Sequence, residues 1–214
     1  MATRNAASMG DYGSSWQHRG YSGSGNVASL MDCHKDRPAI VAGSAMDVFA
    51  EVDYARAKYP DNIVFGANDV GMYLPKLDHW VSLHADHLNP WKQVRWIHER
   101  GPESIKYHSA TPRAYVDYNW EGLTPLFAVS GYFAMQIAWL MGCSPIILCG
   151  VPGSPRRRFF EGRARDDFGY GGGGNSSDQG IMQQLTNEME RLPDFRVTVR
   201  SMSGFTRDYF GGLD

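Results

Sequence analysis

The 214-residue chain has few cysteines, no long apolar run and no excess of one charge. Its three cysteines, Cys33, Cys143 and Cys149, are odd in number and form no CxxC spacing, which argues against a disulfide framework or a zinc site. The 21 basic and 23 acidic side chains give a net charge of −2, which argues against a dedicated nucleic-acid binder. We therefore expect a protein of a reducing compartment that does not bind nucleic acid.

The sequence also argues against a membrane-spanning protein. The longest apolar stretch, Tyr132 to Met141, is interrupted by Gln136 and falls short of the roughly 20 residues that span a bilayer. That length fits a buried core helix. No apolar segment near the N-terminus has the character of a signal peptide, so we expect a cytoplasmic protein with no membrane partner.

The first 36 residues differ in composition from the rest. Residues 1–26 are rich in glycine, serine and asparagine, and their scattered aromatics follow neither helical nor strand periodicity. Such a segment gains too little from burial to offset the entropy of ordering. We predict an extended N-terminal arm over 1–36, followed by a single domain over 37–214. The arm is either a mobile tail or a device that docks on a neighbouring subunit.

From residue 37 onward, short apolar runs alternate with stretches of helical periodicity. The apolar runs predict strands over 38–42, 62–66, 79–83, 104–108, 145–149 and 195–199. The helical periodicity predicts helices over 47–59, 90–99, 131–141 and 178–192, the second of them beginning at its proline. Because several strands are unbroken apolar runs, the pattern predicts an α/β domain with a mostly parallel sheet and helices on both faces.

Ligands of such sheets bind beyond the carboxyl ends of the strands, where helix N-termini also point. Gly43-Ser44 follows the first predicted strand, and a glycine there lets backbone N–H groups approach a phosphate. Ser130-Gly131 opens the apolar helix, as an N-cap or as a contact to phosphate or ribose. Asn68 lies just past the end of the second predicted strand, where its amide could contact a base or sugar edge or the residue could simply form a turn. Gly150 follows the fifth predicted strand and completes this set.

His84 and Asp86 are the candidate catalytic residues. Histidine is the natural proton carrier near neutral pH, and His84, Asp86 and His87 stand together at a predicted strand end. The same residues could begin a metal site, but a catalytic zinc site needs a third protein ligand that the sequence does not place. We therefore predict no bound metal, and a structural or surface role remains the alternative for these histidines.

An arginine cluster follows the fifth predicted strand. Arg156, Arg157 and Arg158 precede Phe159 and Phe160, and a run of glycines lies downstream. Arginine suits phosphate because it donates two parallel hydrogen bonds. The cluster predicts a lid over a phosphate, and a solvated loop is the alternative because nearby acidic residues offset much of its charge.

Four segments taken together resemble the Rossmann-like sialyltransferase and 6-hydroxymethylpterin diphosphokinase-like superfamily, which includes many uncharacterised phage proteins. They are Ala39 to Ser44, Val64 to Asn68, Ser130-Gly131 and Ile146 to Gly150. The resemblance covers residues 38–152 and implies a Rossmann-like fold. It also implies a nucleotide site, because the matching residues of bacterial sialyltransferases hold the cytidine nucleotide of the donor. Those residues are Gly43, Ser44, Asn68, Ser130 and Gly131.

The chain departs from this family where the reaction takes place. Sialyltransferases of this kind carry an acidic residue and a tyrosine after the late strand's glycine, and a histidine base further on. Here Val151-Pro152-Gly153-Ser154 follows Gly150, and no histidine follows His108. The diphosphokinases need carboxylates for Mg²⁺, for which Asp69 and Asp86 are the candidates. No cofactor is certain, although the resemblance implies a nucleotide-sugar donor and leaves Mg²⁺ open.

The leading hypothesis is a nucleotide- or nucleotide-sugar-dependent transferase that moves a glycosyl or phosphoryl group. The alternative is a non-catalytic phage accessory or virion protein that keeps the fold and assembles through its N-terminal arm, as a homo-oligomer or with a virion partner. A phage origin would place the chain in the host cytoplasm or in the virion. Nucleic-acid modification by glycosyl transfer is a third, weaker hypothesis, because the net charge is close to zero.

Overall fold

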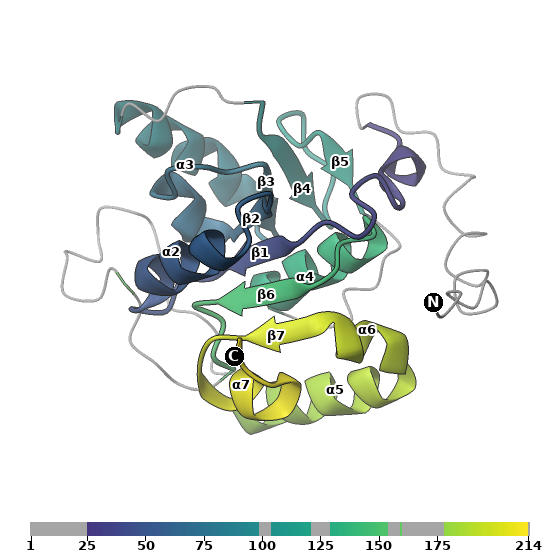
Figure 1. Cartoon of the computed structure of the whole chain (residues 1–214). Coiled ribbons are helices and arrows are strands. Elements are labelled where there is room, and N and C mark those ends of the chain that lie inside the picture. Colours follow the sequence, from purple (N-terminus) through teal and green to yellow (C-terminus); the bar gives the residue numbers. More distant parts are fainter. Residues whose placement is uncertain (1–24, 99–103, 121–128, 154–158, 160–177, 214) are drawn as a thin grey trace.

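The domain is built on one parallel sheet (Figure 1). This computed structural model describes residues 25–98, 104–120, 129–153, 159 and 178–213. The sheet order in these residues is β5-β4-β3-β2-β1-β6-β7, and every neighbouring pair is parallel. The strands are β1 Ala39–Ala42, β2 Ile63–Ala67, β3 His79–Ser82, β4 Lys106–Ser109, β5 Tyr118–Asn119, β6 Ile146–Cys149 and β7 Val199–Ser201. The prediction of a mostly parallel sheet is confirmed.

Helices cover both faces of this sheet. They are η1 Val27–Leu30, α2 Val48–Lys58, η2 Asn68–Met72, α3 Ala85–Ile97, α4 Ser130–Leu140, α5 Asp178–Arg191, α6 Pro193–Thr198 and α7 Gly204–Phe210. The apolar side chains of α2, η2 and α3 pack on one face, and those of η1 and α4 to α7 pack on the other. Figure 1 shows α5, α6 and α7 gathered beside β7. The prediction of helices on both faces is therefore confirmed.

The unbroken apolar strands follow from this double cover. In β1, Ala39 and Val41 point into the core on the α4 side, while Ile40 and Ala42 point into the core on the α2 side. Side chains of a strand alternate between faces, so a strand covered on both must be apolar at every position. Within the described residues, no helix is long and apolar enough to cross a bilayer.

The predicted helix over 90–99 is wrong at its start. Helix α3 begins at Ala85, so Pro90 lies inside it rather than at its first turn. Proline removes the hydrogen bond to the carbonyl four residues earlier, here that of Asp86. Both residues are exposed, so water can solvate that carbonyl, and the helix continues through the proline.

The predicted strand over 195–199 is also wrong. Residues 193–198 form the helix α6, and the strand β7 starts only at Val199. Pro193 occupies the first turn, where its fixed φ suits a helix, and Asp194 lies at the positive end of the helix dipole. The buried Phe195 ring stacks on Trp139 of α4 at 4.6 Å between centroids. Tertiary packing thus decides a segment whose alternation favours a strand.

Residues 25–36 pack against the domain, although the sequence analysis assigns them to the arm. Val27 and Leu30 of η1 are buried in the core on the α4 side. The loop that follows, residues 31–36, caps the C-terminus of α4 through three backbone N–H groups. Those of Asp32, His34 and Asp36 donate to the carbonyls of Leu140, Met141 and Gly142. Residues 1–24 of the predicted arm lie outside the described part of the chain.

A first prediction tests the approach of β1 to β6. A Cβ on Gly43 would collide with the carbonyl oxygen of Gly150 and lie 2.7 Å from Val151 Cγ2. We expect Gly43→Ala to lower the free energy of unfolding by about 1–3 kcal/mol, because backbone cannot yield as a flexible side chain can. Urea titration measures this.

Gly212→Ala is the matched control, since the nearest atom to its Cβ is the Nε of Arg207, at the end of a flexible side chain. Equal stability losses in the two variants would contradict the packing role of Gly43.

Candidate functional site

The order of the strands selects one edge of the sheet as the place for a ligand. From β1 the chain proceeds outward through β2 to β5, and then returns through α4 to β6 on the other side of β1. Connections therefore leave β1 and β6 in opposite directions. In open parallel sheets this arrangement marks the ligand site, at the carboxyl ends of the strands. Gly43, Asn68, Leu83 and Gly150 follow β1, β2, β3 and β6 at that edge.

Ser44 is bonded to a residue that the sequence analysis considered only for magnesium. Its Oγ donates a hydrogen bond to Oδ1 of Asp69 at 2.5 Å. Asp69 lies in η2 and is 2% exposed. A hydroxyl on a buried carboxylate makes a strong, charge-assisted hydrogen bond, so the contact ties the end of β1 to the end of β2.

Asn68 forms a turn and also carries a hydrogen-bonded side chain. Its φ of 60° lies in the left-handed region, which asparagine tolerates better than most residues. Its Oδ1 accepts from the Oγ of Ser82 at 2.8 Å, and its carbonyl accepts from the Nε1 of Trp80 at 2.6 Å. Because the oxygen of the side-chain amide faces Ser82, the NH₂ group is the part that can donate to a ligand.

Ser130 holds the loop after β3. It is the first residue of α4 and is buried, and its side chain does not cap the helix. Its Oγ accepts from the N–H of Leu83 at 3.2 Å, and the Oγ of Ser82 accepts from the N–H of His84 at 2.9 Å. The structure thus links Ser44, Asn68 and Ser130 through one series of contacts across the ends of β1, β2, β3 and α4.

The glycines at this edge act through their lack of a side chain. The N–H of Gly43 donates to the carbonyl of Cys149 at 2.7 Å, and the N–H of Gly150 donates to Oε2 of Glu51 at 2.6 Å. Both amides are therefore already bonded within the protein. Gly131 likewise lies against Val151, with Cγ1 of that residue 3.1 Å from where a Cβ would be. Gly43 and Gly150 therefore shape the edge rather than present their amides to a phosphate, and Gly131 leaves room for Val151.

His84 and Asp86 differ in what holds them. Asp86 accepts from Nε and Nη2 of Arg113 at 2.6 and 3.1 Å and from the Tyr115 hydroxyl at 3.3 Å. The hydrogen bonds of Arg113 lower the pKa of Asp86, so this exposed carboxylate is ionised at neutral pH and cannot donate a proton. His84 is exposed at the start of α3, with its imidazole facing His87 at 6.0 Å between centroids. Its role stays a prediction.

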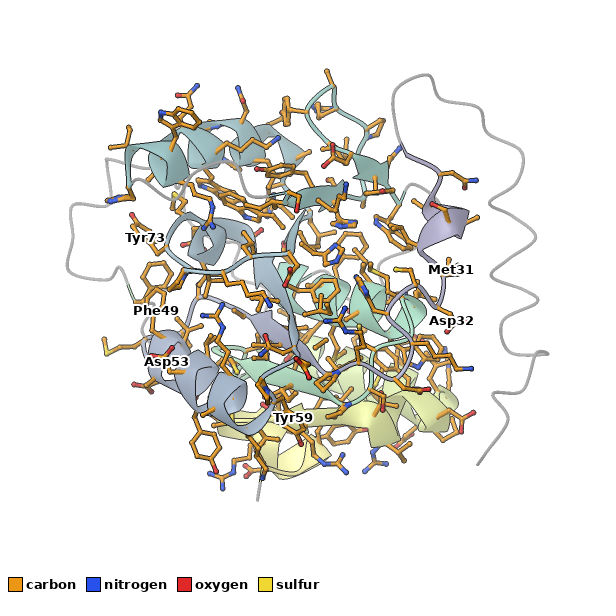
Figure 2. All side chains as sticks on the ribbon, turned by 45° about the horizontal axis from the view of Figure 1, so that its top comes forward. Met31, Asp32, Phe49, Asp53, Tyr59 and Tyr73 are labelled. Atoms are coloured by element: carbon orange, nitrogen blue, oxygen red, sulfur yellow. The ribbon has the colours of Figure 1, made fainter. Side chains whose placement is uncertain are left out.

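Phe159 connects the arginine cluster to this edge. Arg156, Arg157 and Arg158 lie outside the described residues, but the N–H of Phe159 donates to the carbonyl of Ser44 at 3.0 Å. Its ring meets Phe49 of α2 and Tyr73 edge-on, at 5.3 and 5.5 Å between centroids. Figure 2 shows Phe49 and Tyr73 near each other at one end of the molecule. Phe159, the residue that follows the arginine cluster in the sequence, is therefore bonded to the segment that follows β1.

Three residues of this edge have no assigned role in the sequence analysis. Ser82 looks like a strand residue, Glu51 like an ordinary acid in the first turn of a helix, and Phe159 like part of a loop. Their partners lie 14 to 115 positions away along the chain, as the bonds Ser82–Asn68 and Phe159–Ser44 show. Polarity at a predicted strand end is the one signal that points to Ser82. Within the described part of the chain, no group of three His, Cys, Asp or Glu side chains is placed to hold a metal ion.

The comparisons with known proteins identify the fold. No protein-family model matches the chain, and no curated protein matches its sequence. Two solved structures do match. The sialyltransferase CstII from Campylobacter jejuni, in complex with the substrate analogue CMP-3FNeuAc, has a TM-score of 0.57 at 12% identity. The MAf glycosyltransferase from Magnetospirillum magneticum AMB-1 has a TM-score of 0.54 at 14% identity.

The two matches differ in extent. The first covers 84% of this chain and 86% of the sialyltransferase, whereas the second covers 82% of this chain and only 34% of the larger glycosyltransferase. The chain therefore has a glycosyltransferase-like Rossmann fold, in agreement with the sialyltransferase part of the sequence resemblance. Neither of the two structures is described as a diphosphokinase or a phage protein, so the diphosphokinase resemblance and the phage origin stay predictions.

A second prediction tests the hydrogen bonds of Ser82. Ser82→Ala removes the donor to Asn68 and the acceptor for the His84 amide at once. We expect the free energy of unfolding to fall by about 1–2 kcal/mol, because the side-chain oxygen of Asn68 and the backbone amide of His84 each lose a part-buried hydrogen bond. Chemical denaturation measures this. Ser203→Ala, at an N-cap where the serine makes no capping hydrogen bond, should change stability by less than about 0.5 kcal/mol. A neutral Ser82→Ala would show that these bonds do not hold the edge together.

Proposed function

We propose that the protein is a glycosyltransferase that binds a nucleotide-sugar donor at the carboxyl ends of β1, β2, β3 and β6. The observation that carries this proposal is the meeting of Ser44, Asn68 and Ser130, from three distant segments, at the edge where connections leave β1 and β6 in opposite directions. The sharing of the fold with two glycosyltransferases supports it. A cytidine nucleotide is the first donor to test, since the sialyltransferase was solved with a CMP-linked analogue.

The polar groups of the edge suit different parts of such a donor. The NH₂ group of Asn68 would donate to an oxygen of the base or ribose. The carboxylate of Asp69 accepts hydrogen bonds, which suits a hydroxyl, and the N-terminus of α4 at Ser130 and Gly131 favours negative charge.

The phosphate needs cations that this edge does not itself supply. Asp69 and Glu51 place two carboxyl groups near the ends of β1 and β6, and like charges repel an anion. Arg156, Arg157 and Arg158 directly precede Phe159, which is bonded to Ser44. We propose that these arginines bind the phosphate and stabilise the charge of the departing nucleotide.

In the proposed reaction, His84 takes the proton from a hydroxyl of the acceptor. The oxygen of that hydroxyl forms a bond to the anomeric carbon, and the bond from that carbon to the phosphate oxygen breaks, so the nucleotide leaves with both electrons. Asp86 lies two residues after His84 and is held by Arg113. It would thereby fix the start of α3, next to His84. A general base of this kind contributes about 10²–10⁴-fold to the rate.

A third prediction tests donor binding. Cytidine, uridine, adenine and guanine nucleotides are added to the protein at increasing concentration while the melting temperature is followed. A nucleotide at a hundred times its dissociation constant adds roughly 2.7 kcal/mol, or about 5 to 10 °C for a chain of this length. Asn68→Gly should abolish the shift, because glycine keeps the left-handed backbone and removes only the side chain.

The matched control is Asn26→Gly, at the N-cap of η1, where glycine is also tolerated. It should keep the full shift. No response to any nucleotide would refute the proposed donor site, and an equal response in Asn68→Gly would exclude Asn68 from it.

A fourth prediction separates binding from chemistry. We expect His84→Gln to keep the nucleotide-induced rise in melting temperature and to lower release of nucleotide from the sugar donor by about 10²–10⁴-fold. Release is followed by chromatography of the free nucleotide. His98→Gln, an exposed histidine at the other end of α3, should leave the rate unchanged. Full activity in His84→Gln would assign the base to another residue.

A further inference from the structure

A chain of three histidines crosses the sheet away from the proposed donor site. Nε2 of His34 lies 3.0 Å from Nε2 of His79, and Nδ1 of His79 lies 2.9 Å from Nε2 of His108. Nε1 of Trp120 lies 3.1 Å from Nδ1 of His108 and ends the series. We call His34, His79 and His108 the histidine chain. No step of the proposed reaction uses it.

The direction of these hydrogen bonds is determined by one residue. The indole N–H of Trp120 can only donate, so Nδ1 of His108 accepts and its proton resides on Nε2. That Nε2–H donates to Nδ1 of His79, whose own proton is then on Nε2 and donates to Nε2 of His34. His34 therefore carries its proton on Nδ1. All three rings are neutral in this arrangement.

An extra proton cannot enter without breaking a hydrogen bond. Protonated at Nε2, His34 would face the N–H of His79, and protonated at Nδ1, His79 would face the N–H of His108. Reversing the whole series would set the Nδ1–H of His108 against the indole N–H of Trp120. Protonation at any acceptor nitrogen of the chain therefore leaves two N–H groups pointing at each other.

The surroundings also disfavour charge. His108 is fully buried, His79 is 4% exposed, and Phe65 and Tyr118 stack on these two rings. Burial, together with His34 and Lys106, lowers the pKa of His79 to about 3. Burial lowers the pKa of His108 well below its ordinary value and also lowers that of His34.

The charged groups around the chain act in both directions. Arg37, directly after the loop, opposes protonation of His34, whereas Asp78, in the turn before β3, favours it. Lys106 of β4 opposes protonation of His79 and His108. These charges modify the effect of burial and do not reverse it.

The outer end of the histidine chain, His34, lies in the loop that caps the C-terminus of α4. The His34 side chain is half-buried. The backbone N–H of His34 donates to the carbonyl of Met141, between the matching backbone hydrogen bonds of Asp32 and Asp36. Figure 2 shows Met31 and Asp32 of this loop at the end of the molecule opposite Phe49 and Tyr73. Opening this loop would separate His34 from His79 and give both rings access to water.

We propose that the histidine chain is a pH-sensitive latch, which holds the loop 31–36 against the sheet and α4 while its rings are neutral and releases the loop when they take up protons. The sign follows from linkage. The open loop binds more protons than the closed loop below pH 6.5, the ordinary pKa of histidine, so the closed form loses stability as the pH falls from there.

The size of the effect follows from the two rings that opening exposes. The opening constant is the ratio of open to closed loop. It rises about 5-fold between pH 6.5 and 5.5 for each ring that is neutral in the closed loop and has the ordinary histidine pKa in the open loop. His34 and His79 together therefore raise it up to about 30-fold over this interval. Above pH 7.5 the opening constant should become independent of pH.

Hydrogen exchange in the full-length chain tests the latch. Protection factors, corrected for the intrinsic rate at each pH, are measured for the amides of Asp32, His34 and Asp36. We expect them to fall up to about 30-fold from pH 6.5 to 5.5 and to stay below those of Val41 and Leu148 at every pH, because the central strands open only on global unfolding. Protection of the loop that does not change with pH, or that equals the protection of the central strands at every pH, would overturn the proposal.

Two further measurements keep the test decisive. His79→Gln keeps a donor and an acceptor but cannot titrate, so the fall should shrink to about 5-fold, whereas His98→Gln should keep the full effect. If His79→Gln does not fold, nitrogen NMR of ¹⁵N-histidine in the wild type decides. At pH 7.5 it should show His79 and His108 protonated on Nε2 and His34 on Nδ1. A different set of tautomers, or a charged ring at that pH, would overturn the latch.

Discussion

The pairing of β1 with β2 on one side and β6 on the other holds the candidate site together. All three strands are parallel, so their carboxyl ends meet at one edge, and the return through α4 places two oppositely directed connections there. This pairing needs the close approach of Gly43 to Gly150, because a side chain on Gly43 would collide with the carbonyl of Gly150, and one on Gly150 would collide with Val48 of α2. The backbone geometry of two glycines thus decides where the polar side chains of distant segments meet.

The polar groups at that edge are already bonded to one another before any ligand arrives. Ser44 binds Asp69, Asn68 binds Ser82, and Ser130 binds the amide of Leu83. Such a network sets the orientation of each side chain, which lowers the entropy that a ligand would have to restrict. Its carboxylates also make the edge poorly suited to a phosphate on its own. The proposed anionic donor would therefore need cations from another segment, and the arginine cluster directly precedes Phe159, which is bonded to Ser44, in the sequence.

Much of the fold could be predicted because it depends on local patterns. The strands 39–42 and 146–149 are apolar at every position because both faces of the sheet are covered, and an unbroken apolar run can be recognised in the sequence. The order and spacing of short motifs predict that Gly43, Asn68 and Ser130 meet at one edge of the sheet. The segment 195–199 misled because its alternation competes with Pro193 and with the stacking of Phe195 on Trp139, which only the tertiary structure contains.

The histidines show why side-chain chemistry is harder to predict than architecture. His84 stands at a strand end beside Asp86, so it attracted a catalytic role, whereas His79 and His108 lie within strands and look like ordinary residues of a sheet. Their significance arises only from register, since His108 pairs with Val81 and so points to the same face as His79, two residues earlier in β3. Helix α4 then links the two ends of the sheet. Ser130 at its N-terminus belongs to the candidate site, and the carbonyls at its C-terminus bind the loop of His34. In the proposed latch, protons taken up by the histidine chain therefore act first on the loop that caps the C-terminus of α4. The N-terminus of the same helix borders the proposed donor site.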